Sequence, residues 1–228
     1  MAKKSKISAG RQFVKIGALA AAVAGLMAGY ELVVRPWHLR WGATEEEAAS
    51  QLPGDELILH PRMSATHAIT IQSPVEWVWA WVVQMGQGRG GFYSYDWLEN
   101  LFGMQIHNVD EVTPDLQHLQ VGDTVPFWKG AGVQVVEIEA PRLLVLAGGW
   151  NPAGAEEAGQ MGGSWTFALS RHNAKATRLI VRTRAADFPP QWLSARFYRW
   201  LLEPAHFVME RKMLLGIKEH AERGENLA

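Results

Sequence analysis

A histidine and a glutamate stand four residues apart in the C-terminal segment, at His206 and Glu210. On a helix, residues with this spacing share one face and lie about 40° apart. Met209 and Met213 fall on the same face, so the acid and the imidazole lie on an apolar stripe. Burying both groups is costly unless they are paired or hydrogen-bonded. The pattern therefore predicts a polar anchor for a ligand, a general acid–base pair, or a structural pair that satisfies itself.

Tryptophan is the most unusual component of the composition, with 11 among 228 residues. A tryptophan or tyrosine offers a broad apolar face and one polar atom, which suits the wall of a pocket for a flat or lipid-like guest. Packing in the core is the alternative for each of these side chains. The candidate lining residues are Trp79, Arg89, Tyr93, Tyr95, Trp97, Trp128, Trp150 and Trp165.

A glycine-rich stretch at residues 86–91, with the sequence GQGRGG, could be taken for a phosphate-binding loop. Such a loop follows a strand and opens a helix, whereas this one follows a predicted helix and lacks the Gly-Lys-Ser/Thr ending. The stretch therefore predicts a turn between two helices, with Arg89 near the mouth of a cavity.

Several other kinds of chemistry are excluded or disfavoured. The chain has no cysteine, which excludes disulfides, thiolate metal sites and cysteine nucleophiles. The acids and histidines between His107 and His118 lie on a loop-like stretch without metal-ligand spacing, so no metal and no cofactor is expected. Ser94 is not part of a Gly-x-Ser-x-Gly motif. The net charge of −1 leaves no basic body, so no nucleic-acid partner is expected.

The elements that position these residues follow from the period of the apolar side chains. Alternation over residues 67–72 predicts a strand, and a Ser-Pro-Val-Glu capping box at residues 73–76 predicts the start of a helix. A second short helix is expected at about residues 95–102. A period of two after residue 120 predicts strands at residues 123–127, 133–138, 143–147, 164–170 and 177–185. Residues 191–223 predict a helix with a kink or break at Pro204.

The N-terminal segment could cross a membrane. Five basic residues lie at or before the start of an apolar run at residues 13–34, which as a helix would be about 33 Å long. An uncleaved anchor, a cleaved signal peptide and a buried or surface helix all fit, and poor cleavage motifs favour the anchor. The basic residues predict a single-pass protein with a cytoplasmic N-terminus and an extracytoplasmic domain. Residues 35–41 mix Trp and Arg, as expected in the headgroup layer or in a loop that packs on the domain.

The expected organisation has five parts. They are a basic tail (1–12), a transmembrane anchor (13–35), a juxtamembrane connector (36–64), a ligand-binding domain (65–223) and a short tail (224–228).

Four stretches resemble bacterial members of the SRPBCC superfamily, and the resemblance covers about residues 41–222. They are residues 53–57, 83–100, 121–123 and 203–214. The resemblance implies an α+β, START-like helix-grip fold, in which a curved antiparallel sheet wraps around a long C-terminal helix. It also implies a largely apolar cavity between the two. Relatives include lipid-binding domains, plant hormone and allergen proteins, and polyketide cyclases.

Three functions are compatible with these features. The first is a membrane-tethered module that binds a hydrophobic small molecule or lipid. The second is a cyclase- or dehydrase-like enzyme that acts on a polyketide-like or aromatic substrate through His206 and Glu210. The third is a structural or partner-binding domain without a ligand. Binding is favoured because no motif in the sequence requires catalysis.

Overall fold

The computed structural model describes residues 15–225, except residues 16, 20, 102, 129–130, 149–161 and 187–197. The chain divides into two compact units, Met1–Leu39 and Arg40–Ala228, and each is described by itself.

The first unit contains a helix, Gly17–His38, that is long and apolar enough to cross a membrane by length and composition. Its C-terminal part comprises a π-helical turn, η1 (Tyr30–Val34), and α2 (Arg35–His38). The apolar helix expected from the sequence is therefore present, and it extends past residue 35. A signal sequence has the same length and composition, so its role in the membrane is taken up below as a proposal.

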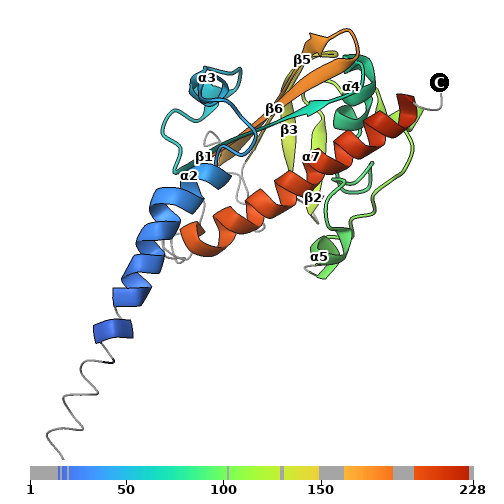
Figure 1. The fold of residues 1–228 in the computed structure, drawn as a ribbon. Helices are drawn as coiled ribbons and strands as arrows, with labels where there is room; N and C mark the ends of the chain where they lie inside the picture. The colour runs from blue at the N-terminus through green and yellow to red at the C-terminus, as the bar shows by residue number, and fades with distance from the viewer. Residues whose placement is uncertain are drawn as a thin grey trace, which may run out of the picture. The chain divides into compact units, whose positions relative to one another are not determined.

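The second unit is built on a six-stranded antiparallel sheet with the order β1-β6-β5-β4-β3-β2 (Figure 1). The strands are β1 (Met63–Ile71), β2 (Thr124–Trp128), β3 (Ala131–Glu139), β4 (Leu143–Gly148), β5 (Gly163–Asn173) and β6 (Ala176–Ala185). Strands β2 to β6 form a meander, and β6 then pairs with β1 from the start of the domain. The strands predicted from the period of two are confirmed, and several are longer than predicted.

Short helices connect and flank the strands. They are α3 (Glu45–Ala49), η2 (Asp55–Leu57), α4 (Val75–Val83), α5 (Asp96–Leu101), η3 (Pro114–Leu116) and η4 (Tyr198–Leu202). The predicted capping box at Ser73 is wrong, because α4 begins after Pro74 without a side-chain cap. The Ser73 carbonyl instead accepts a hydrogen bond from the Thr177 hydroxyl. A π-helical turn gives way to α7 (Glu203–Glu225) next to Pro204, where the sequence predicted a kink or break, and residues 191–197 of the predicted helix lie outside the described residues.

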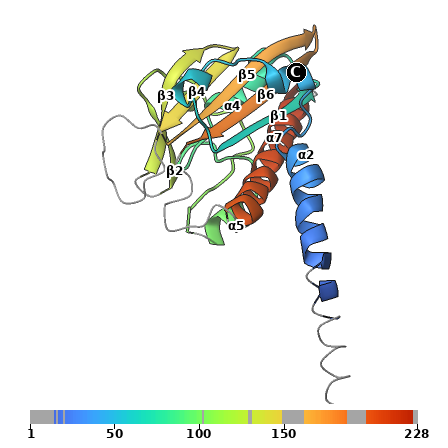
Figure 2. The same cartoon turned by 90° about the vertical axis from the view of Figure 1, so that its left-hand side faces the viewer.

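The long helix α7 crosses one face of the sheet (Figures 1 and 2). Its inward side chains Met213, Leu214 and Ile217 are buried in one apolar core with side chains of the sheet and α4. Gly216 allows this close packing, because a Cβ there would lie 2.4 Å from the Tyr93 carbonyl oxygen. The α+β helix-grip fold is thereby confirmed.

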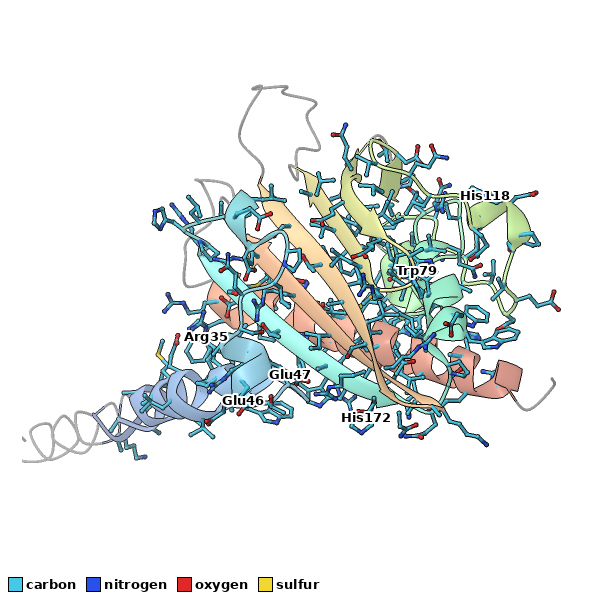
Figure 3. All side chains as sticks on the ribbon, turned by 90° about the horizontal axis from the view of Figure 1, so that it is seen from above. Arg35, Glu46, Glu47, Trp79, His118 and His172 are labelled. Carbon is cyan, nitrogen blue, oxygen red and sulfur yellow. The ribbon has the colours of Figure 1, made fainter. Side chains whose placement is uncertain are left out.

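The opposite face of the sheet is covered by the segment that follows Arg40. Arg178 of β6 holds the Glu47 carboxylate with two hydrogen bonds. Arg182 donates to the carbonyls of Glu47, Ala48 and Ser50, to the Thr66 hydroxyl and to the Asp55 carboxylate. Asp55 also pairs with Arg184. Much of the stretch predicted as a connector is thus packed on the domain, and Glu47 is labelled in Figure 3.

The first residues of this segment lie along the free edge of β1. The Ala68 N–H donates to the Trp41 carbonyl at 3.1 Å. Gly42 has a φ of +73°, and a Cβ there would lie 2.1 Å from the Ala68 carbonyl oxygen, so the close approach requires glycine. The Trp41 ring packs edge-on against Phe207 and lies under the Arg211 guanidinium. Of the two alternatives for residues 35–41, packing on the domain therefore holds for Trp41.

Candidate functional site

Glu210 lies at the centre of a buried polar cluster between α7 and the sheet. Its Oε2 atom is 3.1 Å from Nε2 of His206, one helical turn earlier, and 3.4 Å from Nδ1 of His67 on β1. The Trp165 indole N–H donates to Oε1 at 3.3 Å. The Thr183 hydroxyl lies 3.3 Å from Oε2 and donates to the carboxylate. Side chains from three strands and one helix thus face a single carboxylate.

The register of neighbouring strands explains why these residues meet. Thr183 of β6 pairs directly with Trp165 of β5 on one side and with Ala65 of β1 on the other. His67 lies two residues further along β1, on the same face as Ala65 because side chains alternate along a strand. That face of β1, β6 and β5 lies under α7, whose His206 and Glu210 point toward the sheet.

Burial and neighbouring groups shift the pKa values of this cluster in opposite directions. Burial by itself would raise the pKa of Glu210, but the facing His206 and His67 and the hydrogen bonds from His67 and Trp165 outweigh it, so its pKa lies below the ordinary value. Burial lowers the pKa of His206, although the Glu210 charge opposes this. At neutral pH we therefore expect an ionised carboxylate that accepts hydrogen bonds from uncharged donors, including an imidazole N–H.

His206 is the member of the cluster that solvent reaches most easily. Its side chain is 33% exposed, whereas those of His67 and Glu210 are 1% and 2% exposed. A ligand group or a proton that reaches Glu210 from solvent would therefore meet His206 first.

An aromatic stack adjoins the cluster at Trp165. Phe127 of β2 is stacked on Trp165 at 5.5 Å between ring centroids and on Phe92 at 5.2 Å. Phe167, the next inward residue of β5, lies 4.7 Å from Trp165. One indole thus connects a stack of aromatic side chains, of which Phe92 and Phe167 belong to the buried core, to a hydrogen-bonded carboxylate. An apolar wall with one or two fixed polar groups is the usual composition of a small-molecule site.

Of the site residues predicted from the sequence, the structure brings Trp165, His206 and Glu210 together. Trp79, Tyr93 and Met213 are buried in the core, and Figure 3 shows Trp79 among the side chains around α4. The Tyr93 hydroxyl donates to the Trp81 carbonyl, and burial raises the pKa of Tyr93. These three residues therefore have structural roles where they stand.

The remaining predicted residues lie elsewhere. Tyr95 contacts Trp97 edge-on at 6.5 Å, and Trp97 is exposed on α5. The backbone carbonyl of Met209 accepts a hydrogen bond from the Ser94 hydroxyl. The side chain of Trp128 and all of Trp150 lie outside the described residues.

Arg89 does not have the open position that the sequence suggested. Its guanidinium donates to the carbonyls of Val83, Met85 and Leu116, each at 3.1 Å. Two of these carbonyls belong to the C-terminal end of the α4 segment, where arginine commonly caps free acceptors. Burial lowers the pKa of Arg89. The arginine therefore fixes the glycine-rich turn to α4 and the following loop.

Sequence reasoning missed His67, Thr183, Phe92 and Phe127. A signal for His67 was present, because it occupies the inward row of an alternating strand, where Ile69 and Ile71 are its neighbours. Thr183 likewise shares a face with Leu179 and Val181. What the sequence could not supply was the pairing of β1 with β6, which places both residues opposite Glu210.

The structure also has a hollow away from this cluster. A hollow of about 350 Å³ lies on the outer face of the sheet, lined in part by Asp55, Arg182 and Arg184, which are paired with one another. Across the part of the chain that the structure describes, no group of three or more His, Cys, Asp or Glu side chains is arranged to hold a metal ion.

No protein-family model and no curated protein matches the sequence. Several solved structures are similar in fold. A protein from Mesorhizobium loti is 15% identical, with a TM-score of 0.42 over 70% of this chain and 97% of its own. An HSP90 activator from Plasmodium falciparum is 14% identical, with a TM-score of 0.42 over 69% of this chain and 94% of its own. A protein from Arthrobacter aurescens is 17% identical, with a TM-score of 0.39 over 77% of this chain and 92% of its own.

Proposed function

We propose that this protein is a membrane-tethered binding module that holds a hydrophobic small molecule or a lipid between its sheet and α7. The observation that carries the proposal is the junction at Trp165, where a stack of aromatic rings meets the buried Glu210 carboxylate. A flat or lipid-like guest would lie against the rings, and a hydrogen-bonding group at its end would reach the exposed edge of His206.

Thermal unfolding of the detergent-solubilised protein with fatty acids, isoprenoid alcohols and polycyclic aromatic compounds tests this proposal. A guest at about 100 times its Kd adds about 2.7 kcal/mol to the stability of the protein. We expect Trp165→Leu to weaken binding about tenfold, because stacking and the N–H group are both lost. His220→Gln is the matched control, since His220 stacks on Trp81 in another part of the core. A panel in which no compound stabilises the parent protein would overturn the proposal.

The geometry of His206 and Glu210 also supports a second candidate, an acid–base enzyme of the cyclase or dehydrase kind. A partly exposed imidazole backed by a carboxylate can accept and return a proton, which typically contributes about 10²–10⁴ to a rate. His206→Gln separates the two functions, because glutamine keeps a hydrogen-bonding group but cannot titrate. We expect binding to persist in this variant and no turnover in either protein. Conversion of a bound guest by the parent, lost in His206→Gln with binding intact, would establish the enzyme instead.

The proposed tether is the helix Gly17–His38, with the N-terminus in the cytoplasm and the domain outside. Deleting residues 1–35 should move the protein from the membrane fraction to the soluble fraction with its fold retained, because the second unit contains its own core. Fractionation and circular dichroism measure the two outcomes. Full-length protein with an intact N-terminus in the soluble fraction would contradict the tether.

A further inference from the structure

Exposed apolar side chains gather at one end of the domain. The side chains of Trp97 and Leu101 on α5 are 66% and 73% exposed, and those of Leu201 in η4 and Val208 in the first part of α7 are 52% and 46% exposed. In both Figure 1 and Figure 2, α5 and the N-terminal end of α7 lie at the same lower end of the domain. We call these four residues the apolar end.

The kinds of side chain on the outward side of α7 change along its length. Near its N-terminal end this side carries Val208, followed by the cationic Arg211 and Lys212. The acids Glu219 and Glu222 come in the second half, where they are ion-paired with Arg223 and Lys218. On α5 the exposed acid is Asp96. Apolar and cationic groups therefore lie together at the apolar end, while most of the acidic groups of α7 lie away from it. Tryptophan with neighbouring arginine or lysine is the composition that favours a membrane–water interface.

The chain itself limits how far this end can be from a membrane. The apolar helix ends at His38, and the backbone of Trp41 is already hydrogen-bonded to Ala68 of the sheet. Three residues of chain span about 10 Å at most. Trp41 contacts Phe207 and Arg211, so the chain enters the domain beside the N-terminal half of α7.

We infer that the apolar end rests on the surface of the bilayer that anchors the chain, with Trp97, Leu101, Leu201 and Val208 in the headgroup layer and Arg211 and Lys212 on anionic lipid. The inference rests on the proposed tether. The domain then lies against the membrane rather than standing free of it, and the exposed side of His206, two residues before Val208, is held close to the lipid from which a hydrophobic guest would come.

Because the chain contains no cysteine, single cysteine variants of the full-length protein can each carry one environment-sensitive fluorophore. Val208→Cys places the label at the apolar end. Glu219→Cys is the matched control, since three helical turns later it lies on nearly the same side of α7. Leu26→Cys places a label within the apolar helix and reports on the tether. Each variant is reconstituted into vesicles of phosphatidylcholine and phosphatidylglycerol that contain a lipid-attached quencher.

We expect the labels at positions 26 and 208 to lose most of their emission to the lipid quencher, and the label at position 219 to keep it. Quenching at position 26 without quenching at position 208 would overturn the inference and leave the tether intact. A label at position 208 that is shielded from aqueous iodide, yet not reached by the lipid quencher, would mean that a second copy or another protein covers this end, and would also overturn it. No quenching at position 26 would overturn the tether and the inference together.

Discussion

Replacing Arg182 by methionine should lower the free energy of unfolding by about 3–5 kcal/mol. The Arg182 guanidinium is buried, and its donors are taken up by Thr66, Asp55 and three backbone carbonyls of the covering segment. Methionine fills a similar volume but leaves those carbonyls and the buried Asp55 carboxylate without this partner. Urea unfolding of the soluble fragment that lacks residues 1–35 measures the loss.

Arg171→Met is the matched control for this prediction. Arg171 forms an exposed ion pair with Glu76, and such a pair contributes little to stability because water screens it. The double variant Arg182→Met, Asp55→Leu should lose less stability than the sum of its single variants, because each single change already breaks the contact between Arg182 and Asp55. Equal losses for Arg182→Met and Arg171→Met would show that the covering segment is held by other contacts.

Replacing Glu210 by leucine should lower the free energy of unfolding by about 3 kcal/mol, because Trp165, Thr183, His67 and His206 lose the carboxylate that they face in a buried place. Glu210→Gln keeps one acceptor oxygen and should lose clearly less. Urea unfolding at neutral pH gives both values. If leucine were tolerated as well as glutamine, the carboxylate would not be the group that holds these side chains together.

The same cluster predicts how stability changes in acid. The pKa of His206 is lowered in the folded protein, so below pH 6.5 the unfolded chain binds the proton more readily and stability falls. The pKa of Glu210 is also lowered, so its contribution is present above 4.5 and is lost as the pH falls further. In His206→Gln the first loss should become smaller, with the part due to His220 remaining because burial lowers its pKa too, so the curve of stability against pH is flatter between 6.5 and 4.5. A curve parallel to that of the parent would contradict this assignment.

Local pattern was sufficient to predict most of the fold. Strands such as β5 and β6 follow from the period of two, because an antiparallel sheet with one face under a helix alternates its side chains. Strand β4 is instead a short continuous apolar run that is buried on both faces. The alternation of β6 also separated Leu179, Val181 and Thr183 from the row of arginines on the other face. The break near Pro204 follows from the missing N–H of proline.

The candidate site was only partly predictable. His206 and Glu210 share one helix face, so their proximity could be inferred from spacing. The contribution of His67 depends on β1 pairing with β6 at the far end of the chain, which no local pattern specifies. Arg89 is a case in which local pattern misled. Its position in a glycine-rich stretch suggested an open loop, but its guanidinium binds backbone carbonyls that come from other parts of the chain.

The contact between Trp41 and Ala68 has a consequence for association between copies of the protein. An edge strand with free N–H and C=O groups is a template onto which a strand of another molecule can add, and this is a common start of aggregation. The Trp41 carbonyl occupies the Ala68 N–H near the middle of β1, and Gly42 lets the chain lie too close for another strand to enter there. In the proposed tethered state, copies that share one membrane are concentrated by it, and the first residues of the domain would then protect this edge from edge-to-edge polymerisation. A shortened chain that began after Gly42 would leave this part of the β1 edge uncovered.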